Sequence, residues 1–289
     1  MNRWVLGARP RTLAASVVPV MVGTAAAAGA GGAGTIWWRA LAALVVAIAI
    51  QVATNYVNDY ADAERGADAD RVGPARLVAS GLATAGEVKR AAAASAAVAA
   101  LAGLALAVAV GPELVVVGLA CFAAGYLYTA GPRPYGYAGM GEVFVFAFFG
   151  VVATAGSAYV QLERVTGLAL AASVPVGVLA TALLVVNNLR DIPTDAASGK
   201  RTLAVRLGAP PARALYIVLI GAAFLALPIL AVARPAALLA ALSAPLAVRP
   251  LRAVAGSAAG AGLFPVLADT GRLQLGFGAL LAAGLALSA

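Results

Sequence analysis

Nine long apolar segments constrain this chain more than any other feature. Each runs for roughly 18 to 23 residues, the length that lets an α-helix cross the hydrocarbon core of a membrane. The mean hydropathy of +0.94 is far above that of water-soluble domains. We therefore predict an all-α polytopic membrane protein, a single transmembrane domain over residues 1–289, with nine helices around a central cavity that opens at the cytoplasmic side. The expected helices lie near residues 12–30, 38–59, 88–110, 114–131, 139–160, 167–188, 212–233, 235–255 and 272–288.

Basic residues lie almost entirely on one side of these predicted helices. Of the 20 lysines and arginines, only Arg39, Arg164 and Arg234 fall on the other side. Because cytoplasmic loops are enriched in basic residues, the N-terminus is expected in the cytoplasm and the C-terminus outside. The net charge of +8 then forms a one-sided belt that faces anionic lipid headgroups, and nucleic acid is not an expected partner. Abundant alanine, and arginine in large excess over lysine, favour a GC-rich bacterial genome. The expected location of this polytopic protein is therefore the inner membrane of a bacterium.

Two acidic clusters close two of the apolar segments. The first is "NYVNDYADAERGADADR" (55–71) and the second is "NNLRDIPTDAASGKR" (187–201). The chain contains no histidine, which excludes any histidine-based zinc site. The oxygen-rich clusters instead suit a hard divalent cation such as Mg²⁺.

Helical phasing places the polar residues of each cluster on one face. At 100° per residue, the polar side chains of the first segment fall within about a 100° arc; these are Gln51, Asn55, Asn58, Asp59 and Asp62. The second set also shares one face, although Pro193 is expected to end or bend the helix; its members are Asn187, Asn188, Asp191 and Asp195. A solvated helix end is the simpler explanation. We favour a metal site, because both polar stripes begin inside apolar segments, where polar groups are costly.

Two Mg²⁺ ions held between the clusters would neutralise a diphosphate and make it a better leaving group. Nearby cations could contact its oxygens, namely Arg71, Arg190, Lys200 and Arg201. An allylic diphosphate would leave a carbocation, which aromatic faces stabilise. The tyrosines near the fourth-to-fifth connection could line such a cavity, or could equally belong to the aromatic belt at the membrane interface; they are Tyr126, Tyr128, Tyr135 and Tyr137.

At this point the chain resembles a known superfamily, the UbiA-type intramembrane aromatic prenyltransferases. The resemblance rests on four stretches, in order, across about two thirds of the chain: "ARPRTLAASVVPVMVGTA" (8–25), "NDYADAERGADADRVGPARLVASG" (58–81), "YTAGPRPYGYAGMGEVFVFAFFG" (128–150) and "NNLRDIPTDAASGKRTLAVRLG" (187–208). Within the superfamily, the forms of the second and fourth stretches most resemble the enzymes that prenylate 1,4-dihydroxy-2-naphthoate in menaquinone biosynthesis.

The resemblance implies roles for individual residues. It puts Asn58, Asp62 and Asp68 on the metal and the diphosphate, with Asp59 close by, and puts Asn188, Asp191 and Asp195 there from the second motif. Asp62, Asp68, Asp191 and Asp195 are the catalytic candidates. Lys200, Arg201 and Arg133 match basic positions of the family that are expected near the diphosphate. Glu142 stands where many relatives have aspartate; with Gln51 and Asn55 it is expected to line the acceptor or cation cavity.

The implied reaction transfers a polyprenyl group from its diphosphate to 1,4-dihydroxy-2-naphthoate in the bilayer, with loss of CO₂. The product is a demethylmenaquinone. One alternative keeps the enzyme class and changes the acceptor, for example to 4-hydroxybenzoate or homogentisate. A second alternative is a divalent-cation transporter, which would carry ionisable residues near the middle of the membrane, where this chain has none. No feature of the sequence specifies an oligomeric state or the prenyl chain length.

Overall fold

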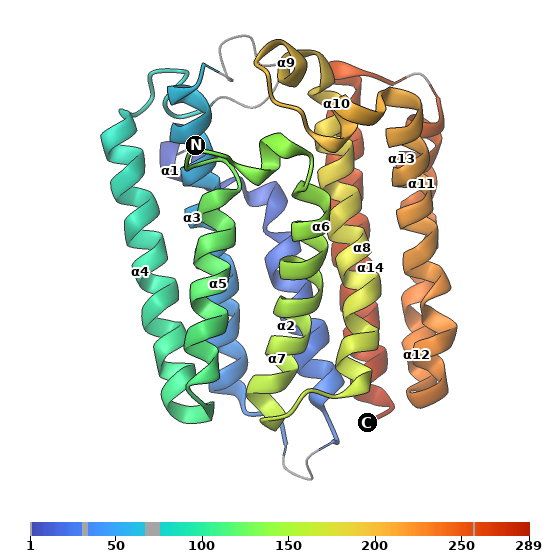
Figure 1. Cartoon of the computed structure of the whole chain (residues 1–289). Helices are drawn as coiled ribbons and strands as arrows, with labels where there is room; N and C mark the ends of the chain where they lie inside the picture. The colour runs from blue at the N-terminus through green and yellow to red at the C-terminus, as the bar shows by residue number, and fades with distance from the viewer. Residues whose placement is uncertain (1, 31–33, 67–75, 257) are drawn as a thin grey trace.

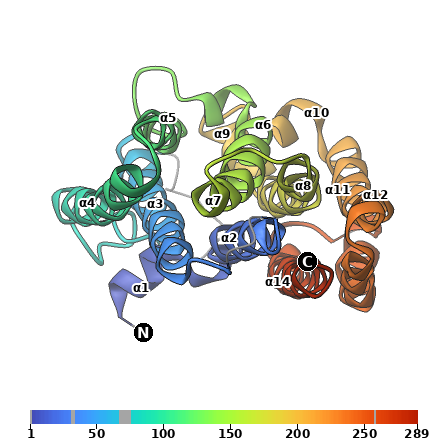
Figure 2. The same ribbon diagram turned by 90° about the horizontal axis from the view of Figure 1, so that it is seen from below.

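The molecule is a bundle of helices that run side by side (Figures 1 and 2). The structure is a computed structural model and describes residues 2–30, 34–66, 76–256 and 258–289. The longer helices are α2 (Ala14–Ala27), α3 (Trp37–Glu64), α4 (Ala85–Val110), α5 (Glu113–Leu127), α7 (Ala153–Leu162), α8 (Gly167–Arg190), α11 (Ala209–Leu225), α13 (Ala244–Ala255) and α14 (Phe264–Leu287). The shorter segments are α1 (Arg3–Ala8), η1 (Pro10–Thr12), η2 (Tyr135–Ala138), α6 (Gly141–Val145), η3 (Phe146–Val152), α9 (Ile192–Ala197), α10 (Leu203–Leu207), α12 (Leu227–Ala233), η4 (Pro235–Ser243) and η5 (Gly260–Leu263).

The prediction of an all-α polytopic membrane protein is confirmed. Within the described residues, seven helical segments are long and apolar enough to cross a membrane. They are Trp37–Glu64, Ala85–Val110, Gly141–Leu162, Gly167–Arg190, Ala209–Ala233, Pro235–Ala255 and Gly260–Leu287. Each overlaps one of the segments expected from the sequence, including the proline-rich segment near 235–255.

The two other expected segments are not single long helices. The segment near 12–30 is α2, which follows α1 and η1 after a bend of 52° and makes an eighth candidate if the pair counts as one span. The segment near 114–131 is α5, with 15 residues. At 1.5 Å per residue it is about 22 Å long, less than the roughly 30 Å of the hydrocarbon core. Hydropathy alone could not reveal either break.

Helix α8 lies at the centre of the fold. It is the most enclosed of the candidate spans, with 78% of its most apolar stretch buried. It packs against α2, α11, α14 and the π-helical segment η3. Because α8 leads directly into the second acidic cluster, this packing fixes the position of that cluster.

Apolar side chains cover the outer surface of the bundle. Val108 on α4, Leu225 on α11 and Val232 on α12 are at least three-quarters exposed. A water-soluble protein would not present so many large apolar side chains, whereas lipid accepts them at no cost. The exposed faces are therefore the lipid-facing surface.

The three arginines outside the one-sided basic belt bind backbone carbonyls at the end of the bundle opposite the acidic clusters. Arg39 on α3 donates to the carbonyls of Val160 (2.9 Å) and Ala109 (3.2 Å). Arg164 donates to Ala30, and Arg234 donates to Ala28. These carbonyls lie at or just beyond the C-terminal ends of helices, where positive charge is favourable. These carbonyl contacts explain why three arginines lie on the side of the membrane that otherwise lacks basic residues.

Close packing of α2 against α7 depends on Gly23. A Cβ atom at this position would lie 2.1 Å from the carbonyl oxygen of Thr154. Small residues allow such close approach of helices in lipid. We expect Gly23→Ala to lower the free energy of unfolding by about 1–3 kcal/mol, because the two helices must separate.

Thermal unfolding in one detergent measures this effect. Gly221→Ala is the matched control, because Gly221 lies in the interior of α11 and an added Cβ has open space. Alanine is the better helix former, so this control should be neutral or slightly stabilising. Equal melting temperatures for the two variants would contradict the packing argument.

Candidate active site

The first polar stripe lies along the second half of α3 and lines a cavity of about 550 Å³. Gln51, Asn55, Asn58 and Asp62 all reach this cavity. Asp59 does not: its carboxylate accepts the backbone N–H groups of Leu77 (2.9 Å) and Val78 (3.0 Å). Asp59 therefore anchors the backbone of Leu77 and Val78 to α3.

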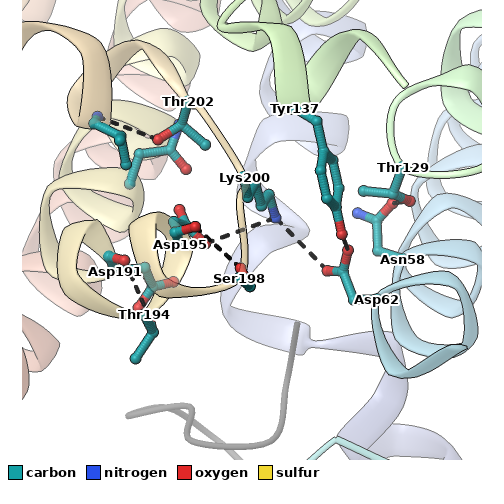
Figure 3. Close-up of polar contacts among 12 residues, drawn as sticks. Asn58, Asp62, Thr129, Tyr137, Asp191, Thr194, Asp195, Ser198, Lys200 and Thr202 are labelled. Atoms are coloured by element: carbon teal, nitrogen blue, oxygen red, sulfur yellow. Dashed lines mark hydrogen bonds and ion pairs between the residues drawn. The ribbon is translucent and has the colours of Figure 1, made fainter. Parts of the chain in front are cut away.

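Asp62 is a buried carboxylate with several polar contacts (Figure 3). It is 1% exposed, and the Tyr137 hydroxyl donates to its Oδ1 at 2.8 Å. The Arg76 guanidinium lies 3.4 Å from its Oδ2, and the Lys200 ammonium lies 3.7 Å from the same atom. Beside it, the Thr129 hydroxyl donates to Asn58 Oδ1 at 2.6 Å. These contacts fix the positions of both side chains.

The second stripe lies where α8 ends. The helix stops at Arg190, and α9 starts again at Ile192 with Pro193 in its first turn, so the expected break at the proline is confirmed. Asn187, Asn188, Asp191 and Asp195 line the same cavity as the first stripe. Two clusters about 130 residues apart in sequence thus meet at one space.

Asp191 forms a buried, bidentate ion pair with its neighbour. Arg190 donates from Nε and from one terminal nitrogen to the two carboxylate oxygens of Asp191, both at 2.6 Å. The same guanidinium donates to Asn187 Oδ1 at 2.9 Å. Because Arg190 does not line the cavity, its contacts serve Asp191 and Asn187.

Lys200 lies between the two clusters. Its Nζ is 3.7 Å from Asp62 Oδ2 and 4.0 Å from Asp195 Oδ1, and it stands over the ring of Tyr137 (Figure 3). The backbone N–H of Lys200 donates to the carbonyl of Asp195, which closes the short loop that carries both residues. A single ammonium group therefore bridges carboxylates from α3 and α9.

Glu142 lies behind the second cluster and does not line the cavity. Its Oε1 accepts the amide N–H of Asn188 at 3.0 Å. The amide oxygen of Asn188 is thereby turned away from Glu142 and is available as a neutral ligand. Glu142 orients a site residue, a role that the sequence did not indicate.

Aromatic rings cover part of the cavity wall. Tyr128 packs edge-on against Tyr135, which stacks on Phe144 with ring centroids 3.9 Å apart, and all three line the cavity. Burial raises the pKa of Tyr135 well above its ordinary value, so its phenol stays neutral at physiological pH. Tyr126 lies elsewhere, half-exposed in a separate surface pocket with Tyr60 and Lys89.

Two other basic residues that were expected near the diphosphate do not line the cavity. Arg133 and Arg201 are exposed and are not among the lining residues. Asp68 and Arg71 lie outside the described residues. Residues that sequence reasoning left without a role do line the cavity, among them Arg9, Arg76 and Thr129. Tyr137, one of the tyrosines expected to line the cavity, instead donates its hydroxyl to Asp62 and is not among the lining residues.

The donor set fits a hard cation that shares its ligands with a substrate. Over the described ranges, no three carboxylate or thiol side chains come close enough to make a complete metal cage. Asp62, Asp191 and Asp195, with the amide oxygens of Asn58 and Asn188, nevertheless offer only oxygen ligands around one cavity. Mg²⁺ is commonly held by one or two carboxylates, water and substrate phosphate oxygens. The residues present therefore fit Mg²⁺.

Comparison with known proteins gives a consistent result. The sequence profile of the UbiA prenyltransferase family matches residues 16–260. The chain is 49% identical to 1,4-dihydroxy-2-naphthoate octaprenyltransferase of Mycobacterium tuberculosis, over 98% of this chain and 97% of the relative. It is 39% identical to the protein of the same name in Escherichia coli, over 75% of this chain and 72% of that relative.

The fold also matches solved structures. A UbiA homolog from Archaeoglobus fulgidus, bound to GPP and Mg²⁺, aligns with a TM-score of 0.69 over 98% of this chain and 99% of that chain. The sequence identity in that alignment is 16%, so the comparison concerns the fold.

Proposed function

This chain belongs to the UbiA prenyltransferase family, and we propose that it transfers a polyprenyl group from polyprenyl diphosphate to 1,4-dihydroxy-2-naphthoate, releasing diphosphate and CO₂ and forming a demethylmenaquinone. Two relatives that share most of their length with the chain carry the name of this activity. The observation that carries the proposal is Lys200, which joins Asp62 of the first cluster to Asp195 of the second beside one cavity.

In this proposal the two clusters hold the diphosphate from opposite sides. Asp62, Asp191 and Asp195, helped by Asn58 and Asn188, would bind two Mg²⁺ ions, which supply charge neutralisation of the leaving diphosphate. Asp68 and Arg71 complete the first motif by family resemblance. Lys200 exchanges its carboxylate contacts for diphosphate oxygens, with Arg201 and Arg133 approaching from the surface.

Other side chains keep these groups in position. Arg190 holds Asp191 through two hydrogen bonds, and Tyr137 holds one oxygen of Asp62. The faces of Tyr128, Tyr135 and Phe144 would stabilise the allylic cation that forms when the C–O bond breaks. The apolar walls exclude water, which would otherwise capture that cation.

The proposed membrane arrangement has nine crossings in a single domain of a bacterial inner membrane, with the N-terminus in the cytoplasm. In this proposal the bent α1–α2 pair makes the eighth crossing, and the shorter apolar helix α5 makes the ninth. The N-terminus, at the start of α1, and the C-terminus, after α14, lie at opposite ends of the bundle (Figure 1). An odd number of crossings requires this arrangement. The clusters and the mouth of the cavity then face the cytoplasm, where both water-soluble and membrane-bound substrates can enter.

Product mass spectrometry tests the function directly. Purified protein in lipid is supplied with Mg²⁺, a set of prenyl diphosphates, and either 1,4-dihydroxy-2-naphthoate or 4-hydroxybenzoate. We expect a decarboxylated, prenylated product from the naphthoate alone. Consumption of 4-hydroxybenzoate alone would overturn the choice of acceptor, and transport of Mg²⁺ into liposomes without any prenylation would overturn the enzyme class.

Replacement of Lys200 tests the bridge between the clusters. Lys200→Ala is expected to lower kcat/KM for the prenyl diphosphate by about 10²–10³-fold, because a positioned cation is lost where charge develops. Lys89→Ala is the matched control: Lys89 is the only other lysine and pairs with Glu64 on the exposed surface. The control should stay within about twofold of the wild-type rate. Similar rates for both variants would refute the role of Lys200.

A further inference from the structure

Arg9 occupies a strained position beside the cavity. It lies between α1 and η1, with φ 53° and ψ 69°, in the left-handed region that non-glycine residues rarely adopt. Such a conformation costs on the order of 1–3 kcal/mol and persists only where the surroundings enforce it. Arg9 lines the same cavity as the two acidic clusters.

Neighbouring hydrogen bonds enforce this conformation. The Asn55 amide donates to the carbonyl of Ala8 at 2.9 Å, and the Thr12 hydroxyl donates to the carbonyl of Arg9 at 2.9 Å. The backbone N–H of Arg9 donates to Leu6 at 3.2 Å. The chain on both sides of Arg9 is thus tied to α3 and to its own helical turns, which sets the direction of the side chain.

Arg9 belongs to a second polar wall of the cavity, made by Arg9, Thr12, Gln51 and Asn55. Gln51 donates from its amide nitrogen to Thr12 and Asn55, at 3.3 and 3.4 Å. Gln51 is 8% exposed, and its Oε1 is buried without a hydrogen-bond partner among the described residues. A buried acceptor of this kind is costly unless a donor reaches it.

This wall is separate from the residues that are proposed to hold the diphosphate. Asn55 and Gln51 precede Asp62 by 7 and 11 residues on the same helical face, which corresponds to about 10 and 16 Å along α3. The wall offers a guanidinium, which suits a carboxylate, and an amide oxygen, which suits a hydroxyl donor. A hydroxylated aromatic acid presents both groups on one ring.

We infer that Arg9 binds the carboxylate of the aromatic acceptor and that Gln51 accepts a hydrogen bond from one of its hydroxyl groups. This inference rests on the proposed function and assigns the acceptor end of the cavity. The acceptor ring then lies on the apolar side of the diphosphate, next to the carbon from which the diphosphate leaves. Arg9 determines specificity for acids over neutral diols.

Equilibrium binding without prenyl diphosphate or added Mg²⁺ tests the inference apart from turnover. The probes are 1,4-dihydroxy-2-naphthoate and 1,4-dihydroxynaphthalene, kept anaerobic, with tryptophan fluorescence as the signal. Arg9→Gln should raise the Kd of the naphthoate about 10- to 100-fold, as expected for a lost hydrogen bond to a charged group, and leave the Kd of the diol within about threefold. Arg11→Gln is the matched control, because Arg11 is exposed, lies two residues away and does not line the cavity.

A second variant keeps the test decisive if Arg9→Gln folds poorly. Gln51→Leu should weaken binding of both probes, since both carry the hydroxyl groups. If the ratio of the Kd of the diol to the Kd of the naphthoate were the same in Arg9→Gln and wild type, the inference would be overturned. A higher KM for prenyl diphosphate with an unchanged Kd for the naphthoate would also overturn it, because Arg9 would then contact the diphosphate. Failure of the wild type to prenylate the naphthoate while Arg9→Gln still loses affinity for it would refute the proposed function instead.

Discussion

Asp62→Asn is expected to lower kcat at least about 10³-fold, a loss of about 4 kcal/mol of transition-state stabilisation. The Asp62 carboxylate is almost fully buried and contacts Lys200, Arg76 and Tyr137 at once. Asparagine keeps the shape of the side chain but removes the charge that would hold Mg²⁺ and balance the two cations. The expected loss therefore concerns the chemical step, measured as product formed at saturating concentrations of both substrates.

Glu64→Gln is the control for Asp62. Glu64 ends the same helix, carries the same charge and forms a half-exposed pair with Lys89. Its replacement should change kcat by less than about twofold. If Asp62→Asn kept more than a tenth of the wild-type kcat, a loss below about 1.4 kcal/mol, the assignment of Asp62 to the metal site would be wrong.

Asp191→Ala is expected to destabilise the folded protein by about 3–5 kcal/mol, in addition to abolishing turnover. Arg190 and Asp191 are both nearly buried, and two hydrogen bonds of 2.6 Å join them. Removal of the carboxylate leaves a guanidinium buried without its counter-ion. We had no reason from the sequence to expect this second effect, because Arg190 was predicted to contact the diphosphate.

A double variant separates the two effects. Arg190→Met combined with Asp191→Leu removes both charges and should recover much of the lost stability while turnover stays absent. Thermal unfolding of wild type, Arg190→Met, Asp191→Leu and the double variant in one detergent gives the coupling between the two positions. Equal stability of wild type and Asp191→Ala would contradict the importance of the ion pair.

Helical phasing predicted most of the first cluster and also explains its one departure. Gln51, Asn55, Asn58 and Asp62 lie within an arc of about 60° by phase and all line the cavity. Asp59 is offset by 80° from Gln51, at the edge of the polar arc, and its carboxylate turns to the backbone of Leu77 and Val78. Residue type alone does not distinguish a metal ligand from an acceptor of backbone hydrogen bonds.

The sequence predicted that the two acidic clusters meet, but not the individual contacts that other segments make with them. No periodicity relates Arg9, Tyr137 and Lys200 to Asp62, because their positions depend on how α1, η2 and the loop after α9 fold over α3. Hydropathy located the seven long segments well, since lipid requires a minimum apolar length. It did not show the bend before α2 or the short length of α5, because hydropathy measures how apolar a segment is and not where its backbone changes direction or stops being helical.

Arg39 has a consequence for how the bundle can accommodate a long lipid substrate. It extends from α3 to carbonyls at the ends of α4 and α7, and helices α3, α4 and α7 all contribute walls to the cavity. The hydrogen bonds of Arg39 link these three helices at one end of the bundle, and the two acidic clusters lie at the other end. A prenyl tail between these walls would therefore meet three helices whose spacing at that end is fixed by the hydrogen bonds of Arg39.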